Sequence, residues 1–222
     1  MIVVAPCYLK AQVFIAAEGT YSSYSMKELK QFQQESAQSI SPDLKTVTNF
    51  PSYFGWGVNG GYSINDKVSL GASFRYMSTG ARSDIRDYSG QITYDQLLQS
   101  YSAGIFVRAK IFTIKKLGGY LGANTYYVRT SDELISTAKA GTQSDSDRAR
   151  LKGHGIGFVP SLQVFYSLTS EVFLYATAGY ESQVQKKLKY QGQETNLHAQ
   201  WDGLRFTLGI GYQFNKHQPP DK

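Results

Sequence analysis

The residues best suited to acid–base chemistry are the three histidines, His154, His198 and His217. None of them belongs to an H-E-x-x-H or a G-x-S-x-G motif, which mark zinc proteases and serine hydrolases. His154 and His198 could still meet a serine and an aspartate to form a hydrolytic or acyl-transfer set, the candidate aspartates being Asp145, Asp147 and Asp202. Solvated loops commonly carry such residues without any catalytic role. We therefore expect no catalytic residues and keep an enzyme as an alternative.

A metal or cofactor site would need a cluster of suitable ligands. The acidic run Ser144-Asp145-Ser146-Asp147 resembles part of a calcium-binding loop, but it lacks the glycine and the distal glutamate of an EF-hand. The single cysteine, Cys7, allows no intramolecular disulfide. We expect neither a metal nor a cofactor, and we interpret the acidic run as a solvated loop tip.

The net charge of +6 raises the question of nucleic-acid binding. Lys186, Lys187 and Lys189 form a small basic run, but the other basic residues are scattered and partly offset by acids. No nucleic-acid motif accompanies them. We expect no nucleic-acid partner, and near a membrane surface such cations would meet anionic lipid head groups instead.

The clearest structural signal is the run from Trp201 to Phe214, in which apolar and polar residues alternate. One face carries Leu204, Phe206, Leu208, Ile210, Tyr212 and Phe214, and the other carries Arg205, Thr207, Gly209, Gly211 and Gln213. A period of two with aromatic residues on the apolar face suits a barrel wall between lipid and a narrow polar interior.

The same alternation recurs along the chain and predicts about eight strands in an all-β fold. Three connections are short, at 65–67, about 111–117 and 167–171, and the long ones fall between them. The first long connection contains a predicted helix, Met26–Gln38, with Ser25 as its N-cap. The others are predicted as polar loops, at 78–95, 130–150 and 182–200. This arrangement predicts an eight-stranded antiparallel up-and-down transmembrane β-barrel with short periplasmic turns and long extracellular loops.

Composition is compatible with such a barrel. In a membrane-spanning strand only alternate residues meet lipid, so a mean hydropathy of −0.34 is no obstacle. No window of about 20 apolar residues occurs, which argues against a helical membrane protein. The alternative fold is a soluble lipocalin-like ligand-binding barrel, whose apolar faces would point inward; the many Gly and Ser residues on the polar faces disfavour it.

The polar faces of five predicted strands carry charges that would share the barrel interior: Glu18, Arg75, Arg108, Glu181 and Arg205. The lumen of an eight-stranded barrel is just wide enough for side chains to fill it. Because an isolated buried ion is very costly, these groups must pair. We predict an interior charge network in which arginines serve as bidentate partners of the two glutamates.

Aromatic residues gather near the predicted strand ends, where the membrane meets water. We interpret them as an interfacial girdle and not as a sugar-binding platform. The set comprises Tyr53, Phe54, Trp56, Tyr76, Tyr101, Tyr126, Tyr127, Tyr180 and Trp201. The facing of the fifth strand is left open, because Tyr126 and Tyr127 are adjacent.

The final strand ends in Tyr212-Gln213-Phe214, which resembles the C-terminal signal that the barrel assembly machinery reads in bacterial outer-membrane proteins. With its strands and turns, the chain resembles small outer-membrane barrels of the OmpA/OmpX-like type. Segments 78–82, 87–90 and 26–29, and the leader-like residues 10–12, also resemble uncharacterised barrel proteins of Bacteroidota. The resemblance implies an address in the bacterial outer membrane without an assigned reaction.

We divide the chain into a signal-peptide remnant at 1–11, a barrel at 12–214 and a short periplasmic tail at 215–222. The function we expect is that of a non-enzymatic structural or interaction protein, or of an accessory subunit in a larger envelope complex, acting through extracellular loops. Its expected partners are outer-membrane lipid or lipopolysaccharide, the assembly machinery and an envelope protein. The alternatives are a small-solute pore, a lipid-modifying enzyme at the barrel rim and the lipocalin-like barrel.

Overall fold

The computed structural model describes residues 12–40, 51, 53–86, 88 and 90–214. The predicted leader and tail, with Cys7 and His217, lie outside these residues. One helix and ten strands follow in chain order: β1 (Gln12–Ser22), α1 (Lys27–Ile40), β2 (Tyr53–Ser63), β3 (Val68–Arg86), β4 (Gln91–Ile114), β5 (Leu117–Ala140), β6 (Gln143–Ser167), β7 (Val172–Gln185), β8 (Lys189–Tyr190), β9 (Gln193–Glu194) and β10 (Gly203–Phe214).

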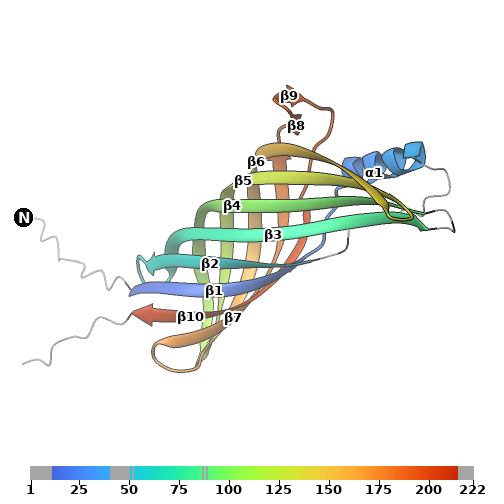
Figure 1. Ribbon diagram of the computed structural model, residues 1–222. Coiled ribbons are helices and arrows are strands. Elements are labelled where there is room, and N and C mark those ends of the chain that lie inside the picture. Colours follow the sequence, from blue (N-terminus) through green and yellow to red (C-terminus); the bar gives the residue numbers. More distant parts are fainter. Residues whose placement is uncertain (1–11, 41–50, 52, 87, 89, 215–222) are drawn as a thin grey trace, which may run out of the picture.

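Eight of these strands close into a ring (Figure 1). The order β5-β4-β3-β2-β1-β10-β7-β6 is completed by the pairing of β5 with β6, and each pair is antiparallel. The first and last strands pair along their length, from Val13 opposite Phe214 to Ser22 opposite Arg205. The short strands β8 and β9 form a small hairpin that continues the sheet beside β6. The all-β, eight-stranded fold predicted from the alternation is confirmed.

One end of the barrel carries the short turns and both termini of the ring (Figure 1). Asn65 shapes the β2–β3 turn, because its side-chain oxygen accepts hydrogen bonds from the amides of Lys67 and Val68, both at 2.8 Å. Thr169 plays the same part in the β6–β7 turn, where its hydroxyl accepts from the Val172 amide at 2.9 Å. The two long connections, between β1 and β2 and between β7 and β10, lie at the opposite end, together with the short links of the β3–β4 and β5–β6 hairpins.

The regions 78–95 and 130–150, predicted to be polar loops, are instead largely strand. β3 and β4 stay paired up to Arg86 and Gln91, and β5 and β6 up to Ala140 and Gln143. The prediction was wrong because beyond the membrane both faces of a strand meet water or polar groups, so the apolar alternation fades while the backbone ladder continues. The two hairpins project well past the rest of the ring (Figure 1).

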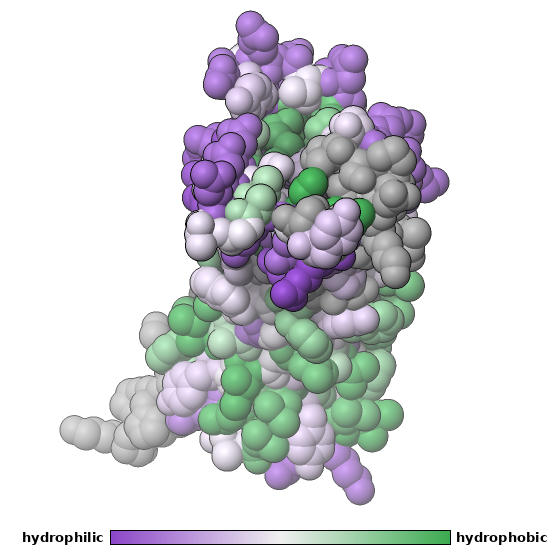
Figure 2. Space-filling model, turned by 45° about the vertical axis from the view of Figure 1, so that its right-hand side comes forward, coloured by the Kyte–Doolittle hydropathy of each residue, from purple (hydrophilic) through white to green (hydrophobic). Residues whose placement is uncertain are grey.

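The facing of the strands follows the predicted alternation. On β10, Leu208 lies on the outer face and is 71% exposed. Arg205 lies on the inner face of the same strand and is 3% exposed. Each of the eight ring strands contributes exposed apolar side chains to an outer band, here called the apolar belt; examples, one per strand, are Ile15, Val58, Phe74, Ile105, Leu121, Leu162, Leu174 and Leu208. Figure 2 shows apolar residues gathered over one part of the surface and hydrophilic residues over the other. A soluble lipocalin-like barrel would have the opposite facing.

The end with the long connections is closed by a lid, made of α1 with residues 23–26 and of residues 186–202. Backbone bonds join its two parts: the Ser25 amide donates to the Asp202 carbonyl at 3.1 Å, and the Met26 amide to Gln200 at 3.4 Å. Met26 and Leu29 are fully buried in a cluster with residues of β3, β4 and β6. The lid therefore has its own hydrophobic core beyond the apolar belt.

The helix predicted in this region is present, with its start at Lys27. Met26, which precedes the helix, has a positive φ of 37°. Glu28, in the first turn, contacts the connection between β7 and β10. The Glu28 carboxylate accepts from the His198 amide at 2.9 Å and contacts the His198 ring nitrogen Nδ1 at 2.8 Å. This contact fixes the first turn of the helix against residues 186–202.

Trp201 corrects the predicted girdle, because it lies inside the lid and not on the outer surface. Its side chain is 1% exposed, and its indole N–H donates to the Thr130 hydroxyl of β5 at 3.0 Å. The Tyr24 ring meets it edge-on, with the ring centroids 4.9 Å apart. The backbone contacts between the lid's two segments draw this residue inward, over the barrel mouth.

We expect Trp201→Ala to loosen the lid and leave the ring intact, because the tryptophan fills the lid core while the strand ladders do not depend on it. Loss of a buried tryptophan costs about 3–5 kcal/mol. Limited proteolysis of the purified protein in detergent should show faster cleavage within residues 186–202. Trp201→Phe keeps an aromatic ring in the lid core but loses the hydrogen bond to Thr130, so its cleavage rate should rise less than that of Trp201→Ala. Equal cleavage rates for the unaltered protein and both variants would contradict this role.

Candidate functional site

The interior of the barrel contains a connected set of charged and hydrogen-bonding side chains. Glu18 of β1 lies 3.5 Å from the Arg75 guanidinium of β3. Its other oxygen accepts from the Asn59 amide at 2.6 Å and from the Tyr175 hydroxyl at 2.8 Å. Glu18 is 9% exposed, so the guanidinium and these two donors replace the water that its carboxylate loses.

A second pair lies nearer the lid. Glu181 of β7 contacts the Arg205 guanidinium of β10, and both side chains are almost fully buried. Tyr126 of β5 joins the two pairs, because its hydroxyl donates to Glu181 at 2.7 Å and accepts from Arg75 at 3.3 Å. The interior network thus runs as a continuous chain across the lumen from Glu18 to Arg205.

Two glycines make room for this network. Gly57 and Gly209 lie opposite Glu18 on its two neighbouring strands. A Cβ atom at Gly209 would stand 2.3 Å from the Tyr175 ring, and one at Gly57 would stand 3.0 Å from the Glu18 carboxylate. The glycines that the alternation placed inward therefore receive the side chains of facing strands.

The structure places the five predicted interior charges on the inner face, but it does not bring all of them into one network. Arg108 takes no part in the ion pairs. The contact between Arg75 and Glu18 is a single one and not the predicted bidentate pair, because Asn59 and Tyr175 occupy the second carboxylate oxygen. Sequence reasoning missed the tyrosines, although the alternation around Leu174 and Ala176 already turns Tyr175 inward.

The predicted girdle is only partly as expected. Trp56, Tyr101 and Tyr180 are about half exposed on the outer face, and Tyr76 lies between the first two, with its ring 5.0 Å from that of Tyr101. Tyr126 is a correction, since it is 3% exposed inside the barrel while its neighbour Tyr127 faces outward. The side chain of Tyr53 lies outside the described part of the chain.

The residues of the predicted assembly signal face outward at the end with the short turns. Phe214 is 52% exposed, and its ring meets Tyr212 edge-on at 5.0 Å. The Tyr212 hydroxyl donates to Glu171 of the β6–β7 turn at 2.8 Å. The two aromatic rings are therefore presented on the barrel surface at the very end of β10.

Of the three histidines, the structure describes His154 and His198, and it does not bring these two together. His154 lies on the outer face of β6, with its ring 5.9 Å from that of Tyr127, while His198 is bound to Glu28 in the lid. Asp202 instead accepts from the Gln183 amide. Within the described ranges, no group of three or more potential metal ligands occurs. In the same part of the chain, no helix has the length and apolar character needed to cross a membrane.

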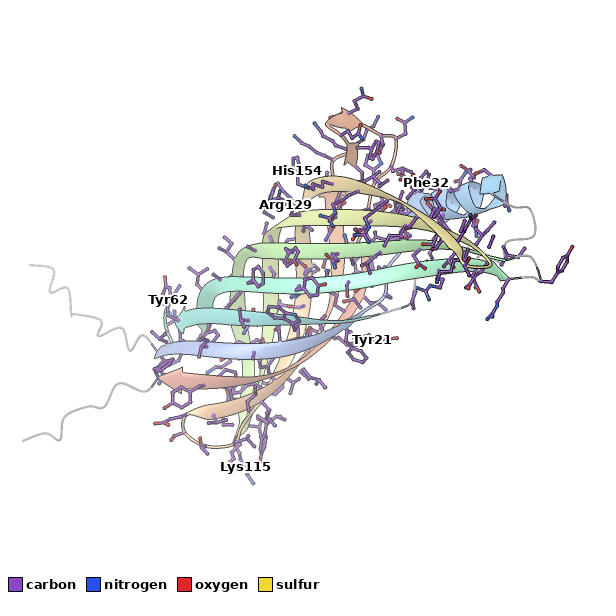
Figure 3. All side chains as sticks on the ribbon, in the orientation of Figure 1. Tyr21, Phe32, Tyr62, Lys115, Arg129 and His154 are labelled. Carbon is purple, nitrogen blue, oxygen red and sulfur yellow. The ribbon has the colours of Figure 1, made fainter. Side chains whose placement is uncertain are left out.

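A cationic groove lies on the outer face of β5 and β6, beside the β8–β9 hairpin. Arg129 and His154 are opposite each other in register, and Lys152 is opposite Lys189 of β8; Figure 3 shows the first two side chains close together. Arg148 and Arg150 complete the groove. The groove begins where the apolar belt ends. Next to Arg129 and His154, toward the membrane, the outward-facing residues are Tyr127 on β5 and Ile156 on β6.

Asp132 is an acid buried inside the projecting part of β5, beyond the apolar belt. Its side chain is completely buried, and only one of its oxygens has a partner, the Gln96 amide at 2.8 Å. Burial raises the pKa of this carboxyl from 3.8 to about 7, and the bond from Gln96 offsets part of that rise.

Replacement of Glu18 tests the interior network. Glu18→Ala leaves the buried Arg75 without its counter-charge, and breaking a buried pair in this way costs about 3–5 kcal/mol. We expect a lower temperature for the loss of the heat-resistant folded band in gel electrophoresis. Glu194→Ala removes an exposed ion pair with Lys189 and serves as the control, because such pairs contribute about 0–1 kcal/mol. An unchanged transition for Glu18→Ala would contradict a stabilising network.

Asp132 predicts a pH dependence of stability. Its pKa is higher in the folded than in the unfolded chain, so between 3.8 and about 7 the folded state holds a proton that the unfolded state has released. The free energy of unfolding should therefore fall as the pH rises through this window and then level off. Asp132→Asn should flatten this part of the profile, measured by urea unfolding in detergent; an unchanged slope would exclude Asp132 as its source.

No protein-family model and no curated protein matches the chain. Among solved structures, Neisserial surface protein A is similar with 13% identity and a TM-score of 0.45, over 92% of this chain and 99% of that one. CarO of Acinetobacter baumannii has 10% identity and a TM-score of 0.44, over 90% and 97%. Ail of Yersinia pestis has 13% identity and a TM-score of 0.34, over 92% and 97%.

The resemblance to Bacteroidota proteins stays a prediction. The apolar belt, in contrast, shows that the barrel wall faces lipid. A closed ring of antiparallel strands with an apolar exterior and a polar interior is the one β architecture that satisfies its backbone in lipid. The chain is a small eight-stranded β-barrel of the bacterial outer membrane.

Proposed function

We propose that this barrel is a non-enzymatic structural or interaction protein that works through its extracellular end. The observation that carries the proposal is the lid. At this end the chain builds a separate hydrophobic core, in which Met26, Leu29 and Trp201 are at most 1% exposed, above a barrel already closed by its own side chains. Such a construction supports a stable surface for contacts and does not favour passage.

A small-solute pore is disfavoured by two successive obstacles. The chain of contacts from Glu18 through Tyr126 to Arg205 crosses the lumen, and the lid covers its outer mouth. A solute would have to break a buried ion pair and then displace Trp201. Either step requires a rearrangement of well-packed groups.

An enzyme at the rim is disfavoured by the surroundings of the two histidines. His198 is held by Glu28 within the lid, and His154 lies among cations on the outer wall. A general base needs a nucleophile or a substrate proton within hydrogen-bond reach. Neither histidine has a serine or cysteine side chain bonded to it in the described residues.

The cationic groove favours anionic lipid of the outer leaflet as one partner. Arg148 and Arg150 share the single carboxylate of Glu133, and Arg129 and Lys152 form no ion pair within the described ranges. The groove adjoins the apolar belt, where the head groups of the surrounding lipid would lie. Guanidinium groups bind phosphate oxygens well, so the phosphates of lipopolysaccharide are suitable ligands.

Two further partners belong to this proposal. The outward rings of Tyr212 and Phe214 supply a surface for the assembly machinery during biogenesis. The projecting β3–β4 and β5–β6 hairpins and the lid supply a surface for an envelope protein, as an accessory subunit would require (Figure 1). Co-purification in gentle detergent, compared with a protein that lacks the hairpin tips, tests the second role.

Conductance of planar bilayers separates the proposed role from a pore. We expect the reconstituted protein to give no channel steps, because the interior network and the lid both block the lumen. A lid variant, Met26→Asp with Leu29→Asp, should also remain silent, since the network from Glu18 to Arg205 persists. A known porin serves as positive control, and stable conductance steps from the unaltered protein would overturn the proposal.

Charge removal tests the lipid contact. Arg129→Gln with Lys152→Gln should weaken binding of the detergent-solubilised protein to lipopolysaccharide, measured by microscale thermophoresis at low salt. Each cation near an anionic surface contributes about 1 kcal/mol, so the double variant should bind roughly 30-fold more weakly. Lys139→Gln with Lys115→Gln removes the same charge from a hairpin tip and from the periplasmic end. Equal losses in both double variants would show that only net charge matters.

A further inference from the structure

We propose that the periplasmic end of the barrel holds a binding site for a small monovalent anion, centred on the Arg108 guanidinium. Arg108 lies on β4, opposite Ser69 of β3 and Gly122 of β5. It faces the lumen near the end with the short turns, away from the lid and from the cationic groove. The site is therefore separate from the surfaces of the proposed function.

The first argument is the balance of charge in the membrane-spanning interior. Three guanidinium groups share this space with two carboxylates. Glu18 is paired with Arg75 and Glu181 with Arg205. Asn59 and Tyr175 also donate to Glu18, and Tyr126 and Gln183 donate to Glu181. Across the described chain, Arg108 has neither an ion pair nor a hydrogen bond. Arg108 is partly buried and has no carboxylate within ion-pair distance in the described residues, so an anion from solution would be stabilising here.

The second argument is the aromatic lining around this guanidinium. Its central carbon lies 4.1 Å from the centroid of the Phe106 ring, 5.9 Å from that of Phe14 and 6.0 Å from that of Tyr175. Ring faces attract a cation and hold it in place, but they accept no strong hydrogen bonds from its N–H groups. Arg108 is thus positioned by the rings, with its donors available to another ligand.

The third argument is the cavity beside it. A cavity of about 70 Å³ is lined by Arg108 together with Tyr120, Gln163 and Ser69. Gln163 is only 4% exposed, and its amide has no partner in the described part of the chain. None of the described residues that line the cavity is acidic. Its polar groups therefore include a cation and several N–H and O–H donors, which is the lining that an anion requires.

The size of the cavity sets the chemical class of the ligand. One water-sized probe occupies about 10–15 Å³ on this scale, so the space admits a few such units. Chloride or the carboxylate of acetate fits this space, whereas a polyhydroxylated anion such as gluconate is too large. Access is from the periplasmic side, since Ser167, the last residue of β6, and Gln213, next to the last residue of β10, belong to the lining.

The test measures thermal unfolding of the full chain in detergent, with sodium gluconate replaced by chloride or acetate at constant ionic strength. A ligand that binds the folded state alone raises the transition temperature as its concentration increases. We expect a rise with chloride and with acetate, and loss of this rise in Arg108→Gln. Lys116→Gln removes an exposed cation at the same end and should keep the rise. Arg108→Gln should lose the dependence on the anion whatever its own stability.

Chloride-35 linewidths give a second readout that does not need a variant. The protein should broaden the chloride signal, and acetate should reverse the broadening while gluconate should not. If Arg108→Gln does not fold, Gln163→Leu replaces it and should reduce both effects. An anion response that is absent, that is equal for gluconate, or that persists unchanged in Arg108→Gln would overturn the proposal.

Discussion

The structure depends on one constraint, which is that no backbone amide or carbonyl can be left unpaired in hydrocarbon. Eight strands meet it by closing on themselves through the β1–β10 and β5–β6 pairings. Closure at this size leaves an interior that side chains must fill. The alternation of each strand then sends its small and charged residues into that space. The paired charges, the glycines beside Glu18 and the apolar exterior are all consequences of the same closed ring.

The narrow interior explains why its charged side chains form ion pairs and hydrogen bonds with one another. Glu18 and Glu181 each have a guanidinium and two further donors, and Tyr126 connects the two groups. Hydroxyl and amide donors replace hydrogen bonds that the two carboxylates would otherwise make with water. The extracellular end is stabilised differently, because it is surrounded by water and can bury apolar side chains away from it. There an apolar cluster around Trp201 does the stabilising, as in a soluble protein.

The alternation in the sequence was sufficient to predict the strands that cross the membrane and the inward position of residues such as Arg75 and Arg205. It is insufficient where both faces of a strand are polar, so at 78–95 and 130–150 the sequence predicts loops where the structure has projecting hairpins. The sequence predicts Trp201 and Tyr126 in the girdle because aromatic residues near strand ends are usually interfacial. For Tyr126 the parity relative to Tyr127 was undetermined, and for Trp201 the partner segment around Tyr24 and Met26 is far away in sequence. The partners of Glu18 depend on register across strands, which one sequence does not contain.

The pairing of β1 with β10 has a consequence for how the protein is made. Ten residues of the first strand, from Val13 to Ser22, find their partners in the last strand, up to Phe214. A chain that stops early, by truncation or by a premature end to translation, offers no partner to β1 and leaves an open sheet edge. The wall of the barrel is thus complete only once β10 has been made, so the order of the strands ties closure of the ring to synthesis of its final strand.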